Sequence, residues 1–266
     1  MFLAFEKKFV PMIYLILETI KKQKNKEINV DEKNSEGDTA IILSLKMKNF
    51  GLFKTLLDMA EKNENLLFQV CEYSNLELLQ YCFSQEFKNK YNIEYTFGIK
   101  DSNGASLLHY GAKNGDIKIC QYLIESGIDI NSKDNEGNIP LIYSLRENVD
   151  VSFIKFLINK GSTRLEDIYE ESIKTGAYCI VSYLIKKGID INRVNQKGES
   201  PLNLLTSYSQ NVKIGQMLLK HGYYIKQELR NKQNDLFYRA IKRKDSNKEF
   251  IEFLIKNGAN FEQTYD

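Results

Sequence analysis

Apolar residues recur at helical spacing in short segments of this chain, and glycines separate those segments. Ile117, Cys120 and Leu123 lie three residues apart, which indicates one buried face of a helix. A shorter segment precedes this one, between Ser106 and Gly115. A serine suits the position just before a helix, and a glycine ends a helix by adopting left-handed backbone. The pattern therefore predicts a pair of short helices separated by a glycine.

The predicted helix pairs recur along the chain. The glycines that end the second helix of a pair are separated by 34, 27, 34 and 36 residues; they are Gly127, Gly161, Gly188, Gly222 and Gly258. The letters GIDIN follow such a helix twice, at 127–131 and 188–192. One pair is too thin to bury its own apolar face, so neighbouring pairs must stack. The sequence therefore predicts an all-α array of repeats.

Several units match parts of a second pattern, Asp-x-x-Gly-x-Thr-Pro-Leu-His, at the start of the first helix. Its matching residues are Asp101, Gly104, Ser106, Leu108, His109 and Gly115; Asp134, Gly137, Pro140 and Leu141; Gly198, Ser200, Pro201 and Leu202; and Gly37, Thr39 and Ile41. With a period near 33 residues, the pattern resembles the ankyrin repeat. The resemblance covers roughly residues 27–262. It implies an ankyrin-type α-solenoid of stacked helix pairs with β-like turns projecting at one side.

The repeat register divides the chain into two parts. Residues 1–26 are expected to form an irregular N-terminal capping helix pair, because Pro11 suits the first turn of a second helix. Residues 27–266 are expected to form about seven units, which open near residues 37, 63, 104, 137, 165, 198 and 233. The units that open near 165 and 233 lack the turn glycine, and the unit near 63 has Ser74 where another has Gly115. We expect the units near 63 and 165 to be less stable than the block 104–161.

Composition narrows the function classes. Hydrophobic residues make up 42% of the 266 residues, which is enough for a core, and 37 Lys and Arg nearly balance 35 Asp and Glu. This balance argues against a nucleic-acid or membrane-surface binder, since both need a basic excess. The apolar run Phe9–Leu17 is too short to span a membrane. Four cysteines without a CxxC indicate reduced thiols, so we expect a cytoplasmic protein. We also expect it to be a monomer.

Few residues offer catalytic or metal-binding chemistry. His109 stands at the histidine of the repeat motif, where the resemblance implies a ring that braces adjacent turns. His221 precedes a helix-ending glycine, and a capping or solvated role is expected. The cysteines lack the spacing of metal ligands. Packing positions are expected for Cys71, Cys82 and Cys120, and a more exposed position for Cys179. We expect no metal, no cofactor and no enzymatic activity.

One basic stretch leaves two interpretations open. Arg239–Lys244 reads RAIKRK, and Asp245 and Glu249 follow it. A solvated helix end is the simpler interpretation. The alternative is a surface for an acidic or phosphate-bearing partner.

The segment Ser84–Asn103 is longer than the corresponding stretch of the other units. It carries Phe87, Tyr91, Tyr95 and Phe97 among charged residues; long segments of this kind are often functional. One interpretation is an extended outer helix and a longer turn, with the rings packed on neighbours. The other is a dedicated partner contact.

The resemblance implies protein–protein recognition without catalysis, on a concave surface of turn tips and first-helix ends. The alternative is a targeting array of a larger enzyme or host-directed effector, with its catalytic domain outside this chain. A third possibility, RNA or DNA binding, would need a basic face. The partner-facing candidates given by the register are Ser102, Asn103, Ala105, Lys113, Asn114, Asn135, Glu136, Asn138, Arg146, Glu147, Gln196, Lys197, Glu199 and Tyr208.

Overall fold

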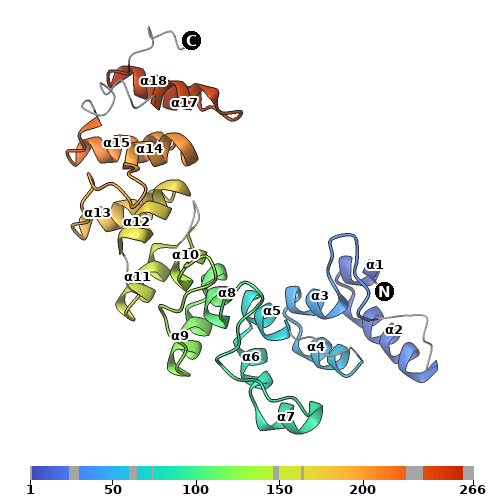
Figure 1. Ribbon diagram of the computed structural model, residues 1–266. Helices are drawn as coiled ribbons and strands as arrows, with labels where there is room; N and C mark the ends of the chain where they lie inside the picture. Colours follow the sequence, from blue (N-terminus) through green and yellow to red (C-terminus); the bar gives the residue numbers. More distant parts are fainter. Residues whose placement is uncertain are drawn as a thin grey trace. The chain divides into compact units, whose positions relative to one another are not determined.

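The computed structural model describes residues 2–23, 30–59, 65–73, 75–145, 150–162, 165–225 and 236–259. These residues form an all-α fold of paired helices (Figure 1). They contain no strand, and their β-like pairing is an isolated antiparallel bridge between Lys100 and Ser106. The expected unit openings near 63 and 233 lie outside the described residues. No helix in these ranges is long and apolar enough to cross a membrane.

The chain divides into two compact units, residues 1–140 and 141–266. The helices of the first unit are α1 (Phe2–Glu6), α2 (Val10–Gln23), α3 (Ala40–Lys46), α4 (Phe50–Leu57), α5 (Leu66–Glu72), α6 (Leu76–Cys82), α7 (Gln85–Tyr91), α8 (Leu107–Asn114) and α9 (Ile117–Glu125). Helices α3–α4, α5–α6 and α8–α9 form pairs, and the first helix α5 packs against both α3 and α8. The pair α1–α2 lies where a capping pair is expected, and α1 contacts α3.

The short helix α10 (Pro140–Tyr143) leads into the second unit. Its further helices are α11 (Val151–Asn159), α12 (Leu165–Lys174), α13 (Tyr178–Lys186), α14 (Pro201–Leu204), the π-helical turn η1 (Leu205–Ser209), α15 (Val212–Lys220), α17 (Leu236–Lys242) and α18 (Lys248–Lys256). First helices pack in the order α12, α14–η1 and α17, and second helices in the order α11, α13, α15 and α18. Stacked pairs therefore bury the apolar faces that the spacing predicts.

Side-chain caps fix where the helices begin. Thr39 and Ser200 accept the N–H groups of Ile42 and Asn203 at the start of α3 and α14. A second series caps the outer helices: an Asn or Asp side chain accepts first-turn N–H groups at Asn49, Asn75, Asp116, Asp150, Asn211 and Asn247. Each such cap stabilises a helix by about 0.5–2 kcal/mol. Only α13 among these described outer helices starts without one, at Ala177.

The cysteines lie where the apolar pattern predicts. Cys71, Cys82 and Cys120 are buried and Cys179 is exposed, and all four are free thiols. Burial raises the pKa of Cys82 to about 12, so this thiol stays protonated at neutral pH. The three buried cysteines therefore act as small apolar side chains.

The long segment after α6 is a packed extension of the first unit. Ser84 caps a separate helix, α7, by accepting the N–H of Phe87 at 3.2 Å. The ring of Phe87 is fully buried, and its centroid lies 4.7 Å from that of Tyr91. Phe83 and Phe97 stack with centroids 3.9 Å apart. The rings thus pack on the protein, as the structural interpretation predicts, although α7 is a new helix and no continuation of α6.

Candidate partner-binding surface

One Asn or Asp side chain folds each regular turn tip. Asp101 Oδ1 accepts the N–H of Asn103 at 2.9 Å and that of Ala105 at 2.8 Å. Gly104 lies between them with φ +75°, a backbone angle that side chains other than glycine rarely adopt. The same pair of bonds is made by Asn34, Asp134 and Asn195. The tips therefore hold their side chains on a fixed backbone.

In the first unit, adjacent turn tips are joined. The backbone N–H of Asn135 donates to Asn103 O at 2.9 Å, and Asn135 Nδ2 donates to Ser102 O at 3.2 Å. The structure thus brings Ser102, Asn103 and Asn135 together as neighbours, all exposed, with Glu136 beside them. Lys113 and Asn114 are also exposed, but they lie at the end of α8, the helix that follows the tip.

The residue after each turn glycine is less available than the register suggests. Ala105 is only 1% exposed, so its prediction as a partner contact is wrong. Its N–H is held by Asp101, and the chain there already turns inward to start α8. Asn138 is half-buried for the same reason, and its Nδ2 donates to Asp134 Oδ2 at 3.2 Å. Two further candidates, Arg146 and Glu147, lie outside the described residues.

His109 braces two neighbouring turns, as the resemblance implies. Its ring is fully buried, and Nδ1 accepts the backbone N–H of Ser106 at 3.0 Å. Nε2 therefore carries the proton and donates to Asn138 O at 3.1 Å. Burial lowers the pKa of His109, which keeps the ring neutral. Both ring nitrogens are thus occupied by structural bonds.

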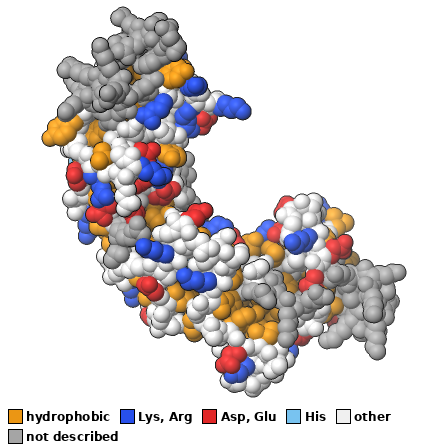
Figure 2. All heavy atoms as spheres, viewed as in Figure 1, with side chains coloured by type: hydrophobic (Ala, Val, Ile, Leu, Met, Phe, Trp, Pro, Cys, Tyr) orange, Lys and Arg blue, Asp and Glu red, His pale blue; other side chains and the backbone are white. Residues whose placement is uncertain are grey.

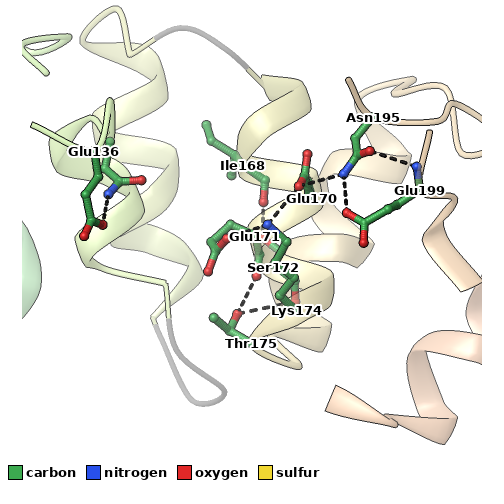
Figure 3. A network of polar contacts seen from close by, with 10 residues as sticks. Glu136, Ile168, Glu170, Glu171, Ser172, Lys174, Thr175, Asn195 and Glu199 are labelled. Atoms are coloured by element: carbon green, nitrogen blue, oxygen red, sulfur yellow. Dashed lines mark hydrogen bonds and ion pairs between the residues drawn. The ribbon is translucent and has the colours of Figure 1, made fainter. Parts of the chain in front are cut away.

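In the second unit, a polar network connects a turn tip with the end of a first helix (Figure 3). Asn195 Nδ2 donates to Glu199 Oε2 at 2.9 Å and to Glu170 Oε1 at 3.0 Å. Lys174 Nζ lies 2.8 Å from Glu170 Oε1 on α12. The same ammonium group lies 5.6 Å from the ring centroid of Tyr208, a cation–π distance. The structure therefore links Glu199 with Tyr208, two of the predicted residues.

The charges in this network are mutually stabilised. Burial alone would lower the pKa of Lys174, but its hydrogen bond to Glu170 and the charge of Glu171 raise it. Burial alone would raise the pKa of Glu170, but hydrogen bonds from Lys174 and Asn195 lower it. Lys174 and Glu170 are consequently an ion pair at neutral pH.

Bonds to α17, to the residue after it and to the start of α18 hold the corner at Tyr208–Gln210, where η1 ends. The carbonyl oxygen of Tyr208 accepts a hydrogen bond from Arg243 Nη1 at 2.6 Å, while the residue remains 47% exposed. Gln210 ends the π-helical turn in left-handed backbone, φ +47°, and is buried. Its Nε2 donates to Ala240 O at 3.2 Å, and its Oε1 accepts the N–H of Asn247 at 2.6 Å. Gln210 thus anchors the corner to α17 and to the start of α18.

Sequence reasoning missed Lys174, Glu170 and Gln210 as parts of this surface. The register assigns no partner-facing residues to the units near 165 and 233, because both lack the turn glycine that sets it. Gln210 stands where two other units have Gly115 and Gly176. Because it is not a glycine, the sequence does not indicate that its backbone is left-handed. Arg243 belongs to the stretch RAIKRK, for which an acidic or phosphate-bearing partner is one of the two interpretations. Gln196 and Lys197, which the register did assign, are exposed on the tip folded by Asn195.

The described surface offers charges, amides and exposed rings. His221 Nδ1 lies 2.9 Å from Met217 O, so the second histidine is also bonded to backbone. The described ranges contain no group of three or more His, Cys, Asp or Glu side chains placed to hold a metal ion. The charges, amides and exposed rings of this surface suit recognition of another polar surface.

The chain matches the family model described as ankyrin repeats (3 copies), over residues 48–134, 67–167 and 170–265. A similar sequence is the ankyrin repeat and KH domain-containing protein mask-1 of Caenorhabditis elegans, 26% identical over 161 residues, 59% of this chain. Another is the target of rapamycin complex 2 subunit AVO2 of Saccharomyces cerevisiae, 27% identical over 140 residues, 49% of this chain. The matched part spans 6% of the first relative and 32% of the second.

Two solved structures share the fold. The human ASB11 ankyrin repeat domain superposes with a TM-score of 0.57 at 19% identity, covering 76% of this chain and 86% of that one. An ankyrin repeat domain from Acinetobacter baumannii gives a TM-score of 0.50 at 20% identity, covering 74% of this chain and 100% of that one. The helix pairs, the turn pattern and the family match agree, and this chain belongs to the ankyrin repeat family.

Proposed function

We propose that this chain binds a partner protein on its first-helix surface, meaning the turn tips together with the C-terminal ends of the first helices. Ankyrin repeats are generally protein–protein interaction modules. The observation that carries the proposal is the network from Glu199 to Tyr208, which connects both parts of that surface. A surface fixed before binding loses less conformational entropy when a partner docks.

Tyr208 is the expected centre of the contact in the second unit. Its ring is exposed on one side and lies beside Lys174 on the other, so it is already oriented. Binding energy concentrates in such tyrosines, which bury large area at a small entropic cost. Lys197 and Glu199 supply opposite charges nearby, and these select the partner by electrostatic complementarity.

Affinity purification of tagged variants from the native cell tests the proposal. The double variant Lys197→Ala/Tyr208→Ala should lose the captured partner, because about 2–4 kcal/mol of binding energy would be removed. The matched control is Lys118→Ala/Lys186→Ala, since both lysines are exposed on second helices, α9 and α13. Capture that survives the first pair and fails with the second would refute the proposed surface.

A second candidate is that this array recruits a partner for a longer protein. The observation that favours it is the small part of each relative that the matched region spans, 6% and 32%. In that case the same surface acts within a larger chain whose other domains supply any catalysis. An immunoblot of the native protein distinguishes the two, because a band near 30.9 kDa excludes the longer protein.

A further inference from the structure

The basic stretch RAIKRK forms one exposed surface in the second unit. Figure 2 shows Lys and Arg side chains gathered over α17 and the turn that follows it. Residues 236–248 contain five Lys or Arg and one Asp, a net charge of +4, whereas the whole chain carries only +2. We call this the α17 surface; its members are Arg239, Lys242, Arg243 and Lys244 with the rings of Tyr208 and Tyr238.

Two sets of contacts hold side chains of this surface in place. Arg239 on α17 donates to Asn203 of α14, and Arg243, the residue after α17, donates to Tyr208 O of η1. Tyr238 and Lys242 lie one turn apart on α17, and Lys242 Nζ is 5.2 Å from the Tyr238 ring centroid. Both arginines are therefore bonded to neighbouring helices, and Arg239, Lys242 and Lys244 are exposed.

Apolar groups accompany the cations. Tyr238 is 39% exposed and Ile241 is 48% exposed, and both lie on the same short helix as Lys242. A solvated helix end needs no such residues, since an exposed ring and an exposed isoleucine cost solubility. Cations interleaved with apolar side chains complement a segment in which Asp or Glu alternates with apolar residues.

We propose that the α17 surface binds an acidic segment of the partner protein, with apolar residues between its carboxylates. This inference rests on the proposed function and names the chemistry of the partner. A nucleic acid fits less well, because Asp245 stands beside Arg243 and would face a continuous row of phosphates. A short acidic segment can place its carboxylates at the lysines and avoid Asp245.

Fluorescence polarisation with the purified chain tests the inference. The probes are three labelled 15-residue peptides that share their Phe and Leu positions and differ in side-chain charge, −6, 0 and +6, together with a 15-nucleotide single strand. We expect the −6 peptide to bind most tightly, at least tenfold more than the neutral one, and to weaken between 50 and 200 mM salt. The variant Lys242→Glu/Lys244→Glu should weaken it by a further tenfold or more.

The matched control is Lys186→Glu/Lys187→Glu, which makes the same charge change on two exposed lysines of the same unit. It should alter the affinity less than twofold. Equal binding of all three peptides, equal loss with both variant pairs, or tighter binding of the oligonucleotide would each overturn the inference. Partner capture that depends on Tyr208 but tolerates Lys242→Glu/Lys244→Glu would leave the proposed function standing and refute this inference alone.

Discussion

The most specific prediction about stability concerns Gln210, because this one residue has two structural roles. It ends a first helix in left-handed backbone, where two other units have Gly115 and Gly176, and its amide bonds to the following helix pair. Gln210→Ala removes the amide bonds but keeps the energetic cost of placing a non-glycine residue in left-handed backbone. Gln210→Gly removes the amide bonds and that cost.

The magnitudes follow from the contacts. The bonds to Ala240 O and from the Asn247 N–H contribute about 0.5–1.5 kcal/mol each, and the buried methylene about 0.8 kcal/mol. Gln210→Ala should therefore lower the free energy of unfolding by about 2–4 kcal/mol. Gln210→Gly should cost about 1 kcal/mol less than Gln210→Ala, because left-handed backbone is unfavourable for alanine.

Urea unfolding followed by circular dichroism measures both differences. With a urea m value of about 2–3 kcal/mol/M, Gln210→Ala should shift the midpoint by roughly 1 M. The control is Gln216→Ala on α15, an exposed glutamine whose loss should stay within about 0.5 kcal/mol. If Gln210→Ala and Gln216→Ala unfold alike, Gln210 does not anchor the corner. If the glycine variant is the less stable one, the backbone argument fails.

Three further predictions concern the first unit. Hydrogen exchange should be faster in α5, which begins without a side-chain cap, than in α8, where Ser106 and His109 form a capping box; equal protection would contradict this. His109→Ala should lower the free energy of unfolding by about 2–4 kcal/mol in urea titrations, since it removes bonds to Ser106 and Asn138 and leaves a cavity. Because burial lowers the pKa of His109, its contribution to stability should be complete above about pH 6.5 and be lost as the pH falls through the folded-state pKa. His109→Gln should abolish that part of the pH dependence, and an unchanged profile would show that another group causes it.

The repeat architecture was predictable because it depends on residues with narrow conformational demands. The turn glycines at 37, 104, 137 and 198 all have positive φ, and Ser200 and Pro201 start α14 as their types suggest. His109 likewise follows from its place in the motif. These positions recur in register, so each supports the others.

The finer surface was less predictable because it depends on contacts between repeats. The repeat register predicts that Ala105 is exposed, but its N–H donates to the Asp101 side chain and the residue is buried. Lys174 and Arg243 lie far apart in sequence, and only the stacking of α12, η1 and α17 places both beside Tyr208. An Asn or Asp stands just before six of the described second helices, a sequence pattern that is typical of helix starts.

Site-specific photocrosslinking in the native cell tests the central claim most directly. A benzoylphenylalanine residue replaces Tyr208 or Lys197 on the first-helix surface, or Lys118 or Lys186 on the second helices. The proposed surface predicts a crosslinked partner protein from positions 208 and 197 and none from 118 and 186. Crosslinks to a partner from 118 or 186, with none from 208 or 197, would contradict it.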